Sequence, residues 1–190
     1  MRSRSRWVLL SLCGILLHPR LAAAQNATVE VPQLVLNQLV AEMGVQSASG
    51  VYHPPGPAPA SSAVPWQWWV TDARFTLGPE AMTFTASVRA QVNTQVTSET
   101  RTVPASVAFD PSTSRLRITV GTFKVPVQSA GVVLTQIDVA KLYGFAVPVA
   151  PQIFTLPLPG GGTRTVTAHV TGVTTQVQPG KLVLNVDVGF

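Results

Sequence analysis

Apolar and polar residues alternate through most of this chain, which is the pattern of strands that bury one face. The longest run extends from residue 82 to residue 96, with Thr, Ser, Arg, Gln and Asn between the apolar positions. Those apolar positions are Met82, Phe84, Ala86, Val88, Ala90, Val92 and Val96. A straight strand of that length would span about 50 Å at about 3.3 Å per residue, so we expect the run to bend or split.

Other alternating runs predict further strands. One short run occupies residues 28–31, and the next begins at Trp66. Later runs occupy residues 103–109, 116–120, 123–127, 133–139, 166–170 and 182–188. Turns are predicted at residues 110–113 and at Pro179-Gly180, and the change of register at residues 121–122 predicts a β-bulge. Residues 146–162 contain four prolines, which cannot donate ladder hydrogen bonds, so we expect an irregular segment at a sheet edge or over an opening.

One segment has helical spacing instead. Leu36, Leu39, Val40 and Met43 recur along one helix face between Pro32 and Gly44, which suit a helix start and a helix end. Residues 53–65 are proline-rich and predict an extended loop. The sequence therefore predicts a mainly β fold: an antiparallel, long-stranded curved sheet, closed as a barrel or folded as a sandwich, with one short N-terminal helix.

The N-terminal composition indicates export. Residues 1–24 combine Arg2, Arg4 and Arg6 with an apolar run over residues 7–17 and three alanines at residues 22–24, as secretory signal peptides do. We expect residues 25–190 to form a single β-rich domain in the bacterial periplasm or outside the cell. An uncleaved anchor and a lipoprotein modified at Cys13 are the alternatives. The apolar run is short for an anchor, and Leu12 precedes the cysteine where a lipoprotein signal prefers a small residue.

Charge and cysteine content narrow the partners. Four of the 13 basic residues lie within residues 1–24, whereas all eight acidic residues follow that segment. The nearly neutral remainder offers no electrostatic reason to bind nucleic acid. Because Cys13 is the only cysteine, residues 25–190 contain no disulfide and no thiolate metal ligand.

Residues that could carry catalysis are sparse. After the predicted signal, the only histidines are His53 and His169, and no Gly-x-Ser-x-Gly motif is present. The acidic residues are widely separated, and no metal-binding motif is found. Gly160-Gly161-Gly162 leads into a predicted strand and not into the helix of a phosphate-binding loop. We therefore expect a protein without enzymatic activity, cofactor or metal.

A tryptophan cluster follows the proline-rich loop. On a strand, Trp66 and Trp68 share one face and Trp69 takes the other. Three interpretations stay open: rings that fill the core and pack under the loop, an aromatic platform for a sugar, or a rim that contacts lipid at a membrane interface.

Two short motifs carry a family resemblance. Val-Leu-Asn-Gln-Leu-Val at residues 35–40, followed by long alternating strands, and Val-Gln-Pro-Gly-Lys-Leu-Val-Leu at residues 177–184 resemble small periplasmic members of the tubular lipid-binding (TULIP) superfamily. The resemblance implies an apolar groove or cavity that accepts acyl chains. The wall residues would be Met82, Phe84, Val88 and Val92, and the rim residues Trp66, Trp68, Phe154 and Leu156. The same side chains can equally form an ordinary packed core.

Two functions follow from these observations. The first is an exported, non-enzymatic cell-envelope protein that binds a lipid or another apolar small molecule, with peripheral contact to a membrane. The alternative is a structural or adhesive envelope module with a packed core that binds a protein or a glycan. A ligand-sized void would distinguish them. The oligomeric state stays open, because an unpaired strand edge can pair with another chain.

Overall fold

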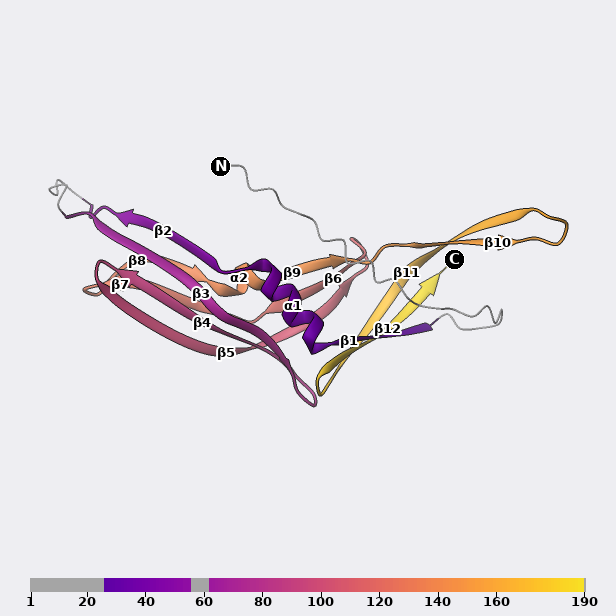
Figure 1. The fold of residues 1–190 in the computed structure, drawn as a ribbon, viewed down its shortest axis with the longest axis horizontal. Helices are drawn as coiled ribbons and strands as arrows, with labels where there is room; N and C mark the ends of the chain where they lie inside the picture. The colour runs from indigo at the N-terminus through magenta and orange to yellow at the C-terminus, as the bar shows by residue number, and fades with distance from the viewer. Residues whose placement is uncertain (1–25, 56–61, 190) are drawn as a thin grey trace.

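The computed structural model describes residues 26–55 and 62–189, so the predicted signal and the middle of the proline-rich loop lie outside the described residues. The mainly β class is confirmed (Figure 1). In chain order the elements are β1 (Asn26–Pro32), α1 (Gln33–Met43), β2 (Gln46–Tyr52), β3 (Val64–Leu77), β4 (Met82–Val92), β5 (Gln95–Asp110), β6 (Arg115–Val120), β7 (Lys124–Ser129), β8 (Val132–Asp138), α2 (Val139–Tyr143), β9 (Phe145–Pro148), β10 (Gln152–Pro157), β11 (Thr163–Gln178) and β12 (Lys181–Gly189).

The main sheet has six antiparallel strands in the order β2-β3-β4-β5-β6-β9, and it is strongly curled. On a flat sheet, the four strand spacings from β3 to β9 would amount to about 19 Å. The rings of Phe75 on β3 and Phe145 on β9 nevertheless lie only 6.5 Å apart. The sheet therefore curves into a half-barrel, which Figure 1 shows beneath α1.

Side chains fill the concave side of the half-barrel. The β7–β8 hairpin and α2 contact β4 and β6 there. The Phe84 ring lies 5.1 Å from that of Phe75 and 5.2 Å from that of Tyr143. Phe123, in the link between β6 and β7, is fully buried beside them. The curled sheet thus encloses a packed aromatic core.

A second sheet has the order β1-β12-β11-β10. Its β11–β12 hairpin packs against β5, where the Thr175 hydroxyl donates a 3.2 Å hydrogen bond to the Val107 carbonyl. β10 pairs with residues 163–168 of β11, and this hairpin, residues 152–168, projects from the body as an arm (Figure 1). Leu182 and Leu184 of β12 join the same buried cluster as the half-barrel core. The two sheets therefore share one hydrophobic core.

Helix α1 takes the place of a strand at the edge of β3. β2 pairs with β3 only as far as Val70, so the later residues of β3 lack a strand partner on that side. There the Asn37 amide nitrogen donates to the Phe75 carbonyl at 3.1 Å, and the Phe75 N–H donates to the Asn37 oxygen at 2.7 Å. Four residues earlier on the same helix face, Gln33 accepts the Leu77 N–H at 2.7 Å.

The turn between β11 and β12 fastens the second sheet to this junction. The Gly180 N–H donates to the Leu77 carbonyl at 3.0 Å, and the Gln33 N–H donates to the Gly180 carbonyl at 2.9 Å. Gly180 has a φ of 74°, which glycine adopts without steric cost. The predicted Pro179-Gly180 hairpin is thus confirmed, and it joins α1, β3 and β12.

The long alternating run splits. Residues 82–92 form β4, a turn follows at Asn93 and Thr94, and the chain returns as β5. The turn reverses the face of Val96, which pairs with Gln91 and is 55% exposed, although the alternation placed it with the core residues. The predicted helix is confirmed as α1, with Leu36 and Val40 buried.

Three local predictions are wrong. Residues 146–162 are not irregular throughout, because they contain most of β9 and all of β10. Each of these strands lies at the edge of its sheet, as their prolines predicted. No bulge forms at residues 121–122; β6 ends there and β7 begins at Lys124. Val139 begins α2 instead of ending a strand. The register shifts of the described ladders include one in β3, between Thr71 and Arg74.

Candidate functional site

The four predicted wall residues are packed core side chains. Met82, Phe84, Val88 and Val92 are 2%, 0%, 1% and 7% exposed, and all belong to the main buried cluster. They lie on the concave face of β4, opposite Leu77, Phe75, Val70 and Trp66 of β3, respectively. These positions therefore face neighbouring protein side chains.

Trp66 and Trp68 lie on the same concave face, half-buried against the core. Trp66 pairs with Gly50 of β2, and a Cβ built on Gly50 would lie 2.6 Å from the ring atom Cζ2 of Trp66. The ring thus covers the backbone of β2 at a position where only glycine leaves room. This arrangement agrees with the core-filling interpretation of Trp66.

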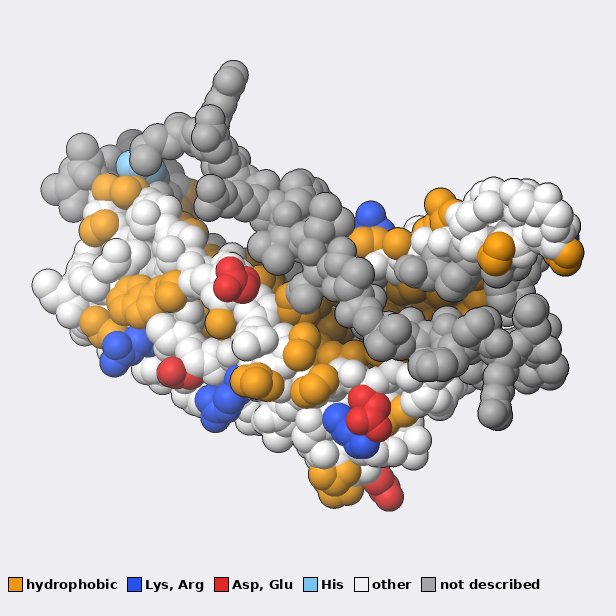
Figure 2. Space-filling model, turned by 45° about the vertical axis from the view of Figure 1, so that its right-hand side comes forward, with side chains coloured by type: hydrophobic (Ala, Val, Ile, Leu, Met, Phe, Trp, Pro, Cys, Tyr) orange, Lys and Arg blue, Asp and Glu red, His pale blue; other side chains and the backbone are white. Residues whose placement is uncertain are grey.

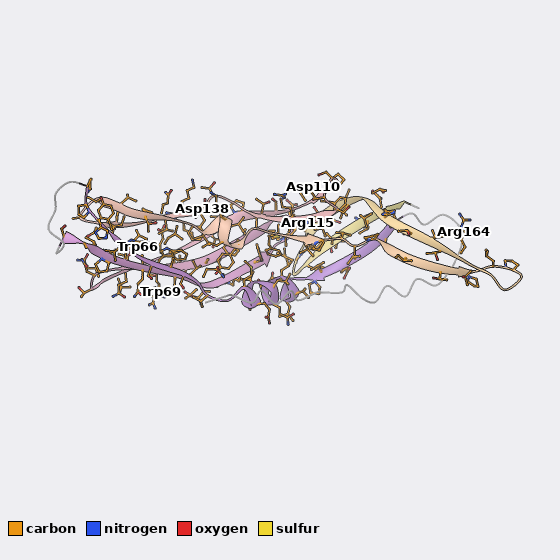
Figure 3. All side chains as sticks on the ribbon, turned by 90° about the horizontal axis from the view of Figure 1, so that it is seen from above. Trp66, Trp69, Asp110, Arg115, Asp138 and Arg164 are labelled. Atoms are coloured by element: carbon orange, nitrogen blue, oxygen red, sulfur yellow. The ribbon has the colours of Figure 1, made fainter. Side chains whose placement is uncertain are left out.

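Trp69 lies on the opposite, outer face of β3. Figure 3 shows Trp66 and Trp69 on different sides of the strand. The Trp69 side chain is half-buried and borders an open recess of about 480 Å³. The residues that line this recess are Val45, Ser47, Ala48, Ser49, Gln67, Trp68 and Trp69. We call it the Trp69 recess.

Polar side chains surround the indole of Trp69 on this outer face. Ser47 pairs directly with Trp69, Ser49 pairs with Gln67, and both serines are exposed. The Gln67 amide nitrogen donates to Gln91 at 2.8 Å, and the Gln91 amide nitrogen donates to the Asn93 carbonyl at 2.8 Å. This relay orients the Gln67 amide and leaves its oxygen able to accept a hydrogen bond.

The indole nitrogen of Trp69 is accessible. In residues 26–55 and 62–189, no buried side-chain nitrogen or oxygen lacks a hydrogen-bond partner, and the Trp69 side chain makes no hydrogen bond. Its N–H therefore reaches solvent. The Trp69 recess thus combines an aromatic surface, an indole donor, two hydroxyls and an oriented amide.

A second recess of about 320 Å³ lies between β6, α2 and β9. Arg117 lines it and contacts Asp110 at 3.9 Å. The pKa of Asp110 is lowered, chiefly because the side chains of Ser112 and Thr113 donate hydrogen bonds to its carboxylate. Burial raises the pKa of the Tyr143 hydroxyl. Neither titrating group lines the Trp69 recess.

The structure does not bring the predicted rim residues together. Phe154 and Leu156 belong to β10, in the second sheet, whereas Trp66 and Trp68 belong to β3 of the main sheet. Figure 1 shows the arm and the start of β3 at opposite ends of the molecule. The side chains of Phe154 and Leu156 lie outside the described ones.

The prediction of site residues omitted Trp69. The alternation along β3 already placed it on the polar face, beside Gln67, where a large aromatic side chain is unusual. That position was its only signal. The sequence did not indicate that Ser47 and Ser49 lie beside Trp69. Both belong to β2, which was not predicted because residues 46–52 show no regular apolar alternation.

The described residues hold neither a metal-ligand cluster nor a membrane-spanning helix. Among the described residues, no three His, Cys, Asp or Glu side chains lie close enough to hold a metal ion. Within that part of the chain, no helix is sufficiently long and apolar to cross a membrane. His53 and His169 are both exposed. No protein-family model, curated protein or solved structure matches the chain.

Proposed function

We propose that this protein is an exported, non-catalytic binding module of the cell envelope that holds a saccharide against Trp69. Export rests on the signal-like pattern of residues 1–24. The observation that carries the binding proposal is the half-buried indole of Trp69 in an open recess among hydroxyl and amide side chains. The function is thus the alternative of the two expected from the sequence.

The chemistry of a sugar ring matches this arrangement. A pyranose presents C–H bonds on its faces and hydroxyl groups around its edge. The C–H face is attracted to the electron-rich face of an indole, while the hydroxyls need donors and acceptors nearby. Ser47, Ser49, Gln67 and the Trp69 N–H supply both.

The sheet holds these groups in place without a ligand. The β2–β3 ladder sets the register of Ser47, Ser49 and Gln67 beside the indole. The hydrogen bonds from Gln67 to Gln91 and from Gln91 to Asn93 orient the side-chain amide of Gln67. Because the ladder already fixes the backbone of these residues, a ligand need not order the strands when it binds. Weak individual contacts can therefore add to a useful affinity.

The packing of the half-barrel supports this choice over an apolar cargo. A cavity that accepts acyl chains needs wall side chains that face a void. Phe84 and Val88 instead contact the aromatic and aliphatic side chains of β3 and α2. Because protein interiors are close-packed, a ligand at these positions would have to displace core side chains. The apolar-ligand function stays a prediction that rests on the sequence pattern.

Affinity electrophoresis with soluble polysaccharides tests the proposal. The protein, produced from its full sequence, should be retarded by at least one polymer, and Trp69→Ala should abolish the retardation. Trp66→Phe is the matched control, because it changes a tryptophan of the same strand on the concave face. Unaltered retardation of Trp69→Ala would contradict the proposal. So would a stoichiometric lipid in the native mass spectrum with no retardation by any polymer.

A further inference from the structure

Arg89 lies directly opposite Trp69 in the β3–β4 ladder. Residues paired in this way have Cβ atoms about 5 Å apart on the same face. Arg89 is exposed, and its guanidinium makes neither an ion pair nor a hydrogen bond among residues 26–55 and 62–189. The one cation stacked on an aromatic ring among those residues is Arg101, over Phe123, so Arg89 does not occupy the face of Trp69.

The acidic side chains of the neighbouring strands form no ion pair with Arg89 among residues 26–55 and 62–189. β2 contains no charged residue, and Arg89 is the only charged residue of β4. On β5, Glu99 pairs with Val88 in the ladder, so it belongs to the concave side, where it forms an ion pair with Arg101. Asp72, in the β3 bulge, accepts a hydrogen bond from Thr71 and makes no ion pair with Arg89.

We infer that the saccharide bound at Trp69 carries a carboxylate, which the guanidinium of Arg89 holds. This inference rests on the proposed function and adds the chemical class of the ligand. Arg89 does not line the Trp69 recess, which lies on the β2 side of Trp69; it lies on the β4 side of the indole. A ring that stacks on the indole and extends across it presents an edge substituent to Arg89. A guanidinium binds a carboxylate through two parallel N–H···O bonds, and no described side chain forms an ion pair with Arg89.

Polygalacturonate, its fully methyl-esterified form and neutral galactan are the probes. Esterification removes the charge and keeps the sugar backbone, so the first two form a matched pair. The protein should bind polygalacturonate about tenfold more tightly than the ester, which corresponds to one charge-assisted interaction. Arg89→Gln should lose that preference and leave the affinity for the ester unchanged. The preference of the unchanged protein should also weaken with added NaCl, because the site is exposed.

Arg115→Gln is the matched control, since it removes the same charge from an exposed position on β6, away from Trp69 (Figure 3). It should keep the preference for polygalacturonate. Equal affinity for acidic and esterified polymers, or a preference that survives Arg89→Gln, would overturn the inference while the proposed function stands. Trp69→Ala that binds all three polymers as the unchanged protein does would overturn both. A protein that binds none of the three, while another polysaccharide retards it, would overturn the inference alone.

Discussion

Replacing Asn37 with alanine should destabilise the protein by about 2–3 kcal/mol. The Asn37 amide is the partner of both the N–H and the carbonyl of Phe75, at 2.7 and 3.1 Å. β2 has left β3 before this point, so no strand can replace these bonds. Each lost hydrogen bond costs about 1 kcal/mol, and a partly buried backbone group left without a partner adds to that cost. For a chain of this size the melting temperature should fall by roughly 5–10 °C.

Two further variants of α1 should show smaller losses of stability than Asn37→Ala. Gln33 accepts one hydrogen bond, from the Leu77 N–H, so Gln33→Ala should cost about half as much as Asn37→Ala. Gln38 is exposed on the same helix, and its side chain makes no hydrogen bond with any described residue, so Gln38→Ala should change stability by less than about 0.5 kcal/mol. Urea unfolding followed by circular dichroism measures all three. The reasoning is refuted if Asn37→Ala is as stable as Gln38→Ala.

Three other changes test the core and the arm. Gly50→Ala should cost about 1–3 kcal/mol in thermal unfolding, because its Cβ meets the Trp66 ring at 2.6 Å, whereas Gly162→Ala, with 3.8 Å to the nearest atom, should be neutral. Buried Tyr143 has a raised pKa, so its contribution to stability is complete below the unfolded pKa of about 10 and is lost as pH rises through the folded pKa. Tyr143→Phe should therefore reduce the loss of unfolding free energy between about pH 9 and 12; parallel losses in both proteins would contradict this. Replacing residues 153–167 by Asn-Gly should change the melting temperature little, because in the described part of the chain β10 pairs only with the arm's own strand and no described side chain of the arm joins the main core cluster. A protein unfolded by that replacement would show that the arm supports the body.

Periodicity predicted the strands whose two faces differ. β4 alternates cleanly because all its apolar residues are buried, whereas four of the five polar residues between them are not. β12 was also predicted, although Val183 is buried on the face opposite to Leu182 and Leu184. The same reasoning missed β2, a sheet-edge strand in which a glycine makes room for the Trp66 ring and contributes no side chain. It also gave the wrong face for Val96, because the Asn93–Thr94 turn interrupts the apolar positions only once, at Thr94. One polar residue at an apolar position does not distinguish a chain reversal from a continuous strand.

The candidate site was less predictable than the fold. Trp69 meets Ser47 and Arg89 only through the pairing of β3 with β2 and β4. The register of these ladders follows from turns and tertiary packing, which the sequence pattern does not report. The packing of Phe84, one of the predicted wall residues, also depends on a distant element, because the Tyr143 ring of α2 contacts it on the concave face. The sequence pattern indicates which side chains of one strand share a face. The site depends in addition on which strands are neighbours and in which register they pair.

The bulge in β3 explains how one strand serves both the core and the outer face. Before it, the even-numbered Trp66, Trp68 and Val70 face the core, and after it the odd-numbered Phe75 and Leu77 do. β4 keeps a single phase throughout, so the extra residue must lie in β3. Asp72 provides it with a φ of 55°, a conformation that Asp tolerates better than most residues. Without this residue, a strand in register at its Trp69 end would turn the Phe75 ring outward, away from Phe84. The bulge also lies between Val70, where β2 pairing ends, and Phe75, where α1 takes over the edge. The change of phase therefore coincides with the change of partner, and it lets Trp69 stay on the solvent face of a strand that is anchored in the core at both ends.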